Sequence, residues 1–255
     1  MSHPDPTASH SKPPVGIRPR LILLPGVGAD ARLFIPQREA FPDLHTPGWL
    51  PHRPEESLLE YASRMAEVIR PLCEIPPSPN VAGGGASGPV LIGGASFGGM
   101  VAYEAARLLP VDGVAQMGSC RHPRAVRSAL RAAGPFAPAV PVASLGIAKV
   151  LSPLAVEMLI NLKRPQRALV ARMFQDSDSH FMKWALTSIL QWQPSPPPEV
   201  PVRAIHGDRD LLIDVKLVEA DEVIPGGGHL INLTHADDVN AFIARMAESV
   251  AATRD

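Results

Sequence analysis

Short apolar runs that end at glycine or proline alternate with helical patterns along most of this chain. The clearest runs are residues 20–24, 89–93, 111–117 and 201–207, with weaker ones at 44–50 and 222–224. Runs of this length between turn residues predict buried strands. Helices are expected at residues 31–40, 58–72, 97–109 and 236–252, and Asp30 and a Ser57-Leu58-Leu59-Glu60 capping box begin the first two. Such alternation predicts an α/β fold, with parallel strands, right-handed crossovers and helices on both faces of the sheet.

Residues 121–198 interrupt this alternation with short helical patterns and no strand pattern. Ten of the 29 prolines fall between Pro123 and Pro198, whereas the expected core helices 58–70, 97–109 and 236–252 contain none. Proline breaks a helix interior, so its distribution separates two regions. We predict an α/β core formed by residues 20–120 and 199–255, with residues 121–198 inserted as a helical cap or lid. Residues 1–19 hold five prolines and no periodic pattern, and are expected to be a disordered or loosely draped leader.

Charge and cysteine content exclude several classes of protein. With 24 Lys+Arg against 25 Asp+Glu, the chain lacks the basic footprint of a nucleic-acid-binding protein. The N-terminus has no basic stretch followed by an apolar run, and the uncharged stretch at residues 132–148 contains three prolines. We therefore expect no secretory signal, no membrane insertion and a cytoplasmic location. Cys73 and Cys120 match no metal or redox spacing and are expected to be buried, reduced thiols.

The pentapeptide Gly94-Ala95-Ser96-Phe97-Gly98 is the main candidate for chemistry. It follows an expected strand and opens an expected helix, the context in which a G-x-S-x-G sequence forms a nucleophile elbow. The two glycines let the strand and helix backbones pass closely, and the serine hydroxyl is exposed at the carboxyl edge of the sheet. The helix start supplies N–H groups and the positive end of a dipole, which stabilise an oxyanion.

A nucleophilic serine needs a base and an acid that orients the base. Among nine histidines, His229 lies in a glycine-rich loop between the last strand and the last helix, where it can reach the sheet edge. His206 ends a strand and is expected to have a packing role, and His235 is expected to be solvated. Asp208 and Asp210 both follow the strand that ends at Gly207. Asp210 is the preferred acid, because the apolar run Leu211-Leu212-Ile213 after it suggests a turn back over the core, and Asp208 is the alternative.

The loop after the first strand, Pro25-Gly26-Val27-Gly28-Ala29, is suited to supply a second oxyanion donor. The same loop supports a rival hypothesis, since residues 26–31 match the G-x-G-x-x-G/A dinucleotide fingerprint of a Rossmann oxidoreductase. That fingerprint needs an acid at the end of the next strand, and residues 46–50 contain none. Asp176, Asp178 and His180 match no defined metal spacing and are better explained as a capped helix start.

Taken together, these motifs resemble the α/β-hydrolase-fold serine hydrolases with a helical cap, and are most similar to capped esterases. The resemblance covers residues 21–252 and rests on residues 23–28, 94–99, 206–210 and 227–229, with the nucleophile, acid and base in the order Ser, Asp, His. It implies that Ser96 is the nucleophile, His229 the base and Asp210 the orienting acid. It also implies an oxyanion hole formed by the N–H groups of Val27 and Phe97. Gly26, Leu211 and Leu230 are the residues expected to bind substrate.

The resemblance also has two departures. Many relatives have His-Gly where this chain has Pro25-Gly26, and the N-terminal hairpin of the fold looks absent or reduced, which implies about six strands. Serine rather than aspartate at the elbow predicts acyl chemistry, namely hydrolysis of carboxylic esters through an acyl-enzyme intermediate, without a cofactor or a metal. The aliphatic residues of the expected cap predict an acyl chain of small or medium size. Because His229 must be neutral to act as a base, activity should fall at acid pH.

Several functions remain open from the sequence. The same fold carries thioesterases, perhydrolases, C–C hydrolases, cofactor-free lyases and receptors with little turnover. Aliphatic residues in the segment 139–160 are expected to contribute to an apolar pocket for the acyl chain, although part of them must pack on the core. The expected partner is therefore a small-molecule ester, and the oligomeric state is left open.

Overall fold

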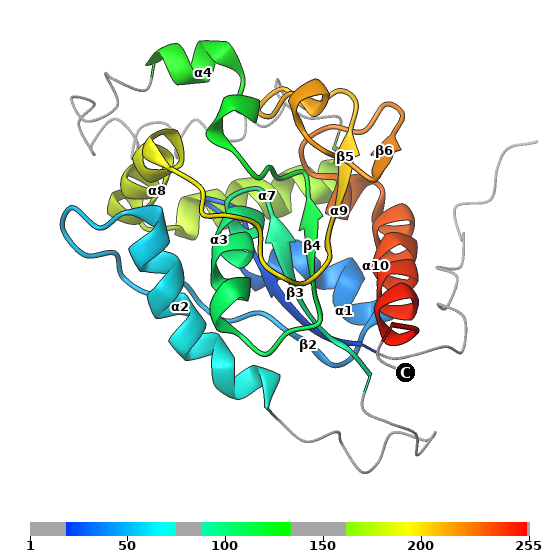
Figure 1. The fold of residues 1–255 in the computed structure, drawn as a ribbon. Helices are drawn as coiled ribbons and strands as arrows, with labels where there is room; N and C mark the ends of the chain where they lie inside the picture. The colour runs from blue at the N-terminus through cyan, green and yellow to red at the C-terminus, as the bar shows by residue number, and fades with distance from the viewer. Residues whose placement is uncertain (1–18, 75–87, 134–161, 254–255) are drawn as a thin grey trace, which may run out of the picture.

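A computed structural model describes residues 19–74, 88–133 and 162–253. These residues form one six-stranded sheet in which every pair of neighbours is parallel, in the order β2-β1-β3-β4-β5-β6 (Figure 1). The strands are β1 (Arg20–Leu24), β2 (Leu44–His45), β3 (Val90–Ala95), β4 (Gly113–Met117), β5 (Val202–Gly207) and β6 (Glu222–Ile224). The predicted α/β class, the parallel sheet and the number of strands are confirmed.

Helices cover both faces of this sheet (Figure 1). The α-helices of the core are α1 (Ile35–Ala40), α2 (Leu58–Cys73), α3 (Phe97–Ala105), α9 (Ile231–Thr234) and α10 (Ala236–Ala251). Short 3-10 helices are η1 (Ala31–Phe34), η2 (Ala106–Leu108), η3 (Pro123–Ala125) and η5 (Val215–Leu217). Asp30 caps η1 through its carboxylate, and Ser57 and Glu60 form the predicted capping box at the start of α2.

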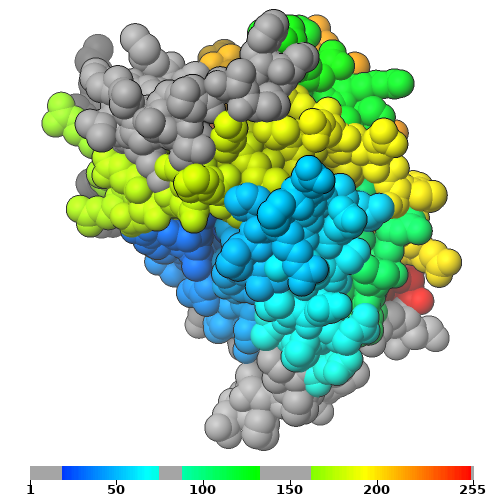
Figure 2. All heavy atoms as spheres, turned by 90° about the vertical axis from the view of Figure 1, so that its left-hand side faces the viewer, coloured from blue at the N-terminus to red at the C-terminus, as the bar shows by residue number. Residues whose placement is uncertain are grey.

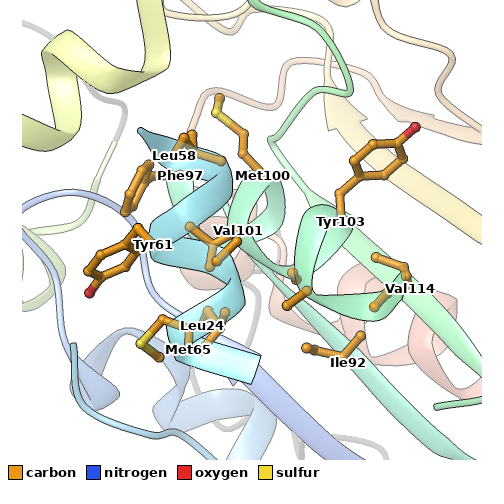
Figure 3. Close-up of a cluster of buried hydrophobic side chains, with 14 of the residues drawn as sticks. Leu24, Leu58, Tyr61, Met65, Ile92, Phe97, Met100, Val101, Tyr103 and Val114 are labelled. Atoms are coloured by element: carbon orange, nitrogen blue, oxygen red, sulfur yellow. The ribbon is translucent and has the colours of Figure 1, made fainter. Parts of the chain in front are cut away.

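The two faces of the sheet are set by alternation along the strands. In β1, Ile22 and Leu24 belong to the buried cluster on the face of α2 and α3, whereas Leu21 and Leu23 belong to the cluster on the face of α10. Every residue of α3 is buried, because this helix lies between the sheet and α2. Figure 3 shows Tyr61 and Met65 of α2 close to residues of α3 in this cluster.

Several predicted elements have different bounds in the structure, and the helix expected at residues 31–40 is divided into η1 and α1. The strand expected at residues 44–50 is limited to Leu44–His45, since Pro47 and Gly48 follow at once and both weaken a strand. Helix α2 extends to Cys73 and includes Pro71, in its last turn. The helix expected at 97–109 is α-helical to Ala105 and continues as η2. The short α9 was not predicted.

The predicted cap is described in two parts, residues 121–133 and 162–198. They contain α4 (Ser128–Ala133), α7 (Arg164–Asp176) and α8 (Ser179–Gln191). Helix α8 packs on the start of α2, where the Trp184 indole donates a hydrogen bond to the Glu56 carbonyl at 2.8 Å, and Figure 2 shows the two helices in contact on one face. The aliphatic segment 139–160, the leader to residue 18 and the proline- and glycine-rich residues 75–87 lie outside the described residues.

Candidate active site

Ser96 lies on a sharp turn between β3 and α3. Its backbone has a φ of 52°, a conformation that residues other than glycine seldom adopt. The turn is held by neighbouring groups. The Ser96 N–H donates to the Met117 carbonyl at 3.1 Å, and the Ser119 hydroxyl donates to the Ser96 carbonyl at 2.7 Å. Strained backbone of this kind persists only where its surroundings fix it, and it is concentrated at functional sites.

The glycines around Ser96 allow close contact between backbones. A Cβ atom at Gly94 or Gly98 would collide with the carbonyl oxygen of Leu24 in β1. At Gly98 the collision would also involve the Pro25 carbonyl, so the clash is with backbone that cannot rotate away. The elbow therefore depends on glycine at positions 94 and 98, because the neighbouring backbone leaves no room there for a Cβ atom.

We expect Gly98→Ala to lower the free energy of unfolding by about 3 kcal/mol, because the added methyl group must push β1 and α3 apart. Urea unfolding followed by circular dichroism measures this change. Gly48→Ala is the matched control, since a Cβ there has no neighbour within 4 Å. Equal stability of the two variants would show that the tight contact at Gly98 is unimportant.

Asp210 and His229 are in direct contact at the carboxyl edge of the sheet. Oδ2 of Asp210 lies 2.7 Å from Nδ1 of His229, and the Asp210 side chain is fully buried. The other oxygen, Oδ1, accepts hydrogen bonds from the N–H groups of Leu212 at 2.7 Å and Ile213 at 3.0 Å. A carboxylate at Nδ1 favours the tautomer that carries a proton there, which leaves Nε2 able to accept one.

The pKa of Asp210 is held well below its usual range by opposing effects. Burial by itself raises the pKa, because it disfavours the charged carboxylate. The close contact of His206, the hydrogen bond with His229, the charge of His229 and the Ile213 N–H together outweigh burial and lower the pKa. Asp210 is therefore an ionised carboxylate at neutral pH.

This shift predicts an acid-sensitive contribution to stability. A depressed pKa stabilises the fold fully above the pKa of an unfolded aspartate, about 3.9, and the contribution is lost as pH falls toward the folded value. We therefore expect the difference in unfolding free energy between wild type and Asp210→Asn to shrink below about pH 4. Urea unfolding over a series of acid pH values tests this, and a difference that stays constant there would contradict it.

Ser96 and His229 lie on either side of the turn that follows β4. Ser96 is hydrogen-bonded to Met117 and Ser119 on one side of this turn. On the other side the His229 carbonyl lies over Gly118, where a Cβ atom would be only 2.7 Å from the His229 carbonyl oxygen. Gly118 has a φ of 51°, so glycine is required there on both counts. Within the described residues the Ser96 hydroxyl makes no hydrogen bond to the His229 ring. Such contacts are often loose without substrate and tighten when it binds.

The predicted oxyanion loop also faces Ser96. The Ala29 N–H donates to the Gly26 carbonyl at 3.2 Å, which closes a turn with Val27 and Gly28 at its centre, and Gly28 has a φ of 75°. A Cβ at Gly26 would lie 3.4 Å from the Cβ of Ser96. Phe97 is the first residue of α3, where backbone N–H groups have no partner within the helix.

Helices α7 and α8 extend over this loop from the predicted cap. A Cβ at Gly28 would lie 2.7 Å from the Phe174 ring and 3.4 Å from the end of Met182. At its other end α7 contacts the segment after His229, because the Gln166 amide donates to the Leu233 carbonyl at 2.7 Å. Apolar side chains of α7 and α8 therefore lie against the turn at Gly28.

The remaining predicted residues have mixed surroundings. Leu230 is half-buried against the core cluster, but Leu211 is 56 % exposed, and of the run Leu211-Leu212-Ile213 only Ile213 turns back over the core. Asp208 is exposed and accepts a hydrogen bond from the Gly226 N–H, away from His229. His206, expected only to pack, has Nε2 at 3.0 Å from Asp210 Oδ2, a contact for which the sequence offered no signal beyond the spacing of four residues.

The residues of the dinucleotide hypothesis and of the Asp176–His180 segment have structural roles. The strand order differs from the 3-2-1-4-5-6 order of the Rossmann fold, and Asp30 caps η1 and pairs with Arg32. Asp178 caps α8, and Asp176 pairs with Arg32 at 2.7 Å. Both cysteines are buried and reduced, as predicted, and burial raises the pKa of the Cys120 thiol to about 12.

Within the described part of the chain, no group of three or more His, Cys, Asp or Glu side chains is arranged to hold a metal ion. None of the helices described combines the length and the apolar character that crossing a membrane requires.

The order of the sheet and the serine turn between β3 and α3 define an α/β hydrolase fold. The sequence agrees, since residues 21–242 match the alpha/beta hydrolase family, and the chain belongs to that family. No curated protein matches the sequence. The family and the fold together support a hydrolase that acts on a small molecule.

Solved structures show the same fold at low sequence identity. An esterase from Thermogutta terrifontis is 17% identical with a TM-score of 0.63, over 92% of this chain and 90% of that one. MenH from S. aureus is 15% identical with a TM-score of 0.64, over 94% and 97%. The N-acyl homoserine lactonase AidH is 16% identical with a TM-score of 0.61, over 91% and 89%.

Proposed function

We propose that this chain is a serine hydrolase that cleaves carboxylic esters of small or medium acyl chain through an acyl-enzyme intermediate. The observation that carries the proposal is the arrangement at the carboxyl edge of the sheet. Ser96, whose backbone is strained, and His229 lie on either side of the turn at Gly118. The His229 ring is hydrogen-bonded to the buried carboxylate of Asp210. A nucleophile, a base and an orienting acid in this arrangement support acyl transfer.

Each group would have a separate task. His229 Nε2 takes the proton as Ser96 Oγ attacks the ester carbonyl, and Asp210 holds the ring and stabilises the imidazolium that forms. The N–H groups of Val27 and Phe97 stabilise the oxyanion, and the leaving alcohol receives the proton from His229. Water, activated by His229, then attacks the acyl-enzyme and releases the acid.

Substrate size would be limited from the side of α7 and α8. Phe174 and Met182 lie against the Gly28 turn, so an acyl or alcohol group bound to Ser96 meets apolar side chains there. Gly26 gives room beside the nucleophile, and Leu211 and Leu230 are proposed to contact more distant parts of the substrate. This arrangement supports small or medium esters over long-chain lipids.

A fluorophosphonate probe tests the proposal, because it reacts with an activated serine and leaves a stable adduct. We expect one adduct at Ser96, located by mass spectrometry of the digested protein. A panel of p-nitrophenyl esters of increasing acyl length then gives kcat/KM against chain length, with a maximum at short or medium chains. Absence of an adduct at Ser96 together with absence of ester turnover would overturn the proposal.

A further inference from the structure

A second histidine contacts the carboxylate proposed to orient the base. His206 is in β5, and its Nε2 lies 3.0 Å from Oδ2 of Asp210, the same oxygen that contacts His229 Nδ1 at 2.7 Å. Because the two backbone N–H groups of Leu212 and Ile213 occupy Oδ1, the carboxylate is surrounded on both oxygens. Asp210 therefore lies between two imidazoles, one from a strand and one from a loop.

His206 has no other described use for its ring nitrogens. The side chain is completely buried, and neither Nδ1 nor Nε2 has a well-aligned hydrogen bond within the part of the chain that the structure describes. Nε2 lies within hydrogen-bond distance of Asp210 Oδ2, at 3.0 Å. A buried polar group without a good partner lowers stability, and an apolar side chain would fill this place in the strand without that cost. A purely structural role would therefore be better served by another residue.

The contact between His206 and Asp210 can assist the proposed reaction. During the proposed reaction His229 becomes positively charged, and Asp210 must stay ionised and in place while this happens. A donor from the rigid strand β5 fixes Oδ2 independently of the loop that carries His229. Two other groups close to Asp210 are the neutral Cys120 thiol and the Arg127 guanidinium, which donates to the Asp210 carbonyl at 2.6 Å.

We infer that His206 is a positioning residue, whose Nε2–H holds the Asp210 carboxylate so that it orients His229. The inference rests on the proposed function, because it assigns a role within the same site. It predicts that the nitrogen at the Nε2 position matters, rather than the volume of the ring.

Three substitutions at this position separate hydrogen bonding from packing. His206→Gln can place an amide N–H near the Nε2 position, His206→Leu fills a similar volume without a donor, and His206→Asn keeps a polar group that cannot reach Asp210. Ile205→Val is the matched control. Ile205 is the buried residue of β5 next to His206, and its side chain belongs to the apolar cluster on the opposite face of the sheet from His206. Circular dichroism establishes whether each variant folds. If the His206→Leu variant does not fold, the His206→Asn variant is used in its place.

Enzyme kinetics and NMR titration test the role of His206. For the Leu or Asn variant we expect kcat on a p-nitrophenyl ester to fall about 10- to 100-fold with little change in KM. The acid limb of its pH profile should move to higher pH, since the carboxylate charge then acts on His229 alone. NMR titration of the His229 ring in the resting protein should show the same shift. His206→Gln should restore most of both properties.

The outcomes distinguish this inference from the proposed function. Unchanged kcat and unchanged His229 titration in the Leu and Asn variants would overturn the role of His206. Equal losses in the Gln, Leu and Asn variants would overturn it too, because packing would then explain the effect. If wild type forms no fluorophosphonate adduct the proposed function fails, and the NMR titration still tests whether His206 acts on the Asp210–His229 pair.

Discussion

Replacing Ser96 by alanine is expected to reduce ester turnover by at least about 10⁴-fold and to remove the fluorophosphonate adduct completely. The reason is that no other described hydroxyl occupies the strained turn between β3 and α3 beside the Gly26 loop. Loss of the hydroxyl leaves the oxyanion donors and the binding surface, which support only slow residual turnover. Steady-state kinetics and probe labelling of the purified variant measure both effects.

The fold should survive this substitution. Ser96 contributes its backbone N–H and carbonyl to the turn, and alanine retains both groups. Ser63→Ala is a suitable control, because its hydroxyl donates only to the Leu59 carbonyl within α2, remote from the elbow. A Ser96→Ala protein that folds and still hydrolyses esters at the wild-type rate would remove Ser96 from the mechanism.

The sheet could be predicted from the sequence because its strands are local patterns. Residues 20–24 and 202–207 are short apolar runs bounded by turn residues, and nothing distant is needed to recognise them. The edge strand β2 was predicted too long, since its extent depends on pairing with β1, where only Leu44 and His45 find partners. Its end is set by tertiary contact and by Pro47.

Part of the candidate site could be predicted for the same reason. The elbow is a local sequence, and the approach of Asp210 to His229 follows from topology, because both residues come after neighbouring parallel strands, β5 and β6. The contact of His206 with Asp210 was missed, since a histidine within an apolar strand has the same pattern as a packed residue. The exposure of Leu211 was equally hidden, because an apolar run does not reveal which of its members turns inward.

Replacing Asp210 by asparagine is expected to lower kcat about 10⁴-fold while the fold is retained. Asparagine keeps the shape of the side chain but can present an N–H to His229, which would favour the tautomer with its proton on Nε2, where the Ser96 proton must be accepted. The substitution also removes the negative charge that stabilises the imidazolium. Steady-state kinetics on a p-nitrophenyl ester at neutral pH measures the loss.

Asp208→Asn provides the matched comparison, because Asp208 was the alternative acid in the sequence. Its carboxylate is exposed and accepts from the Gly226 N–H, so we expect kcat to change less than about threefold. If Asp208→Asn were the inactive variant and Asp210→Asn active, the acid would have to reach His229 by a loop rearrangement. The buried 2.7 Å contact between Asp210 and His229, supported by two backbone N–H groups, opposes such a rearrangement.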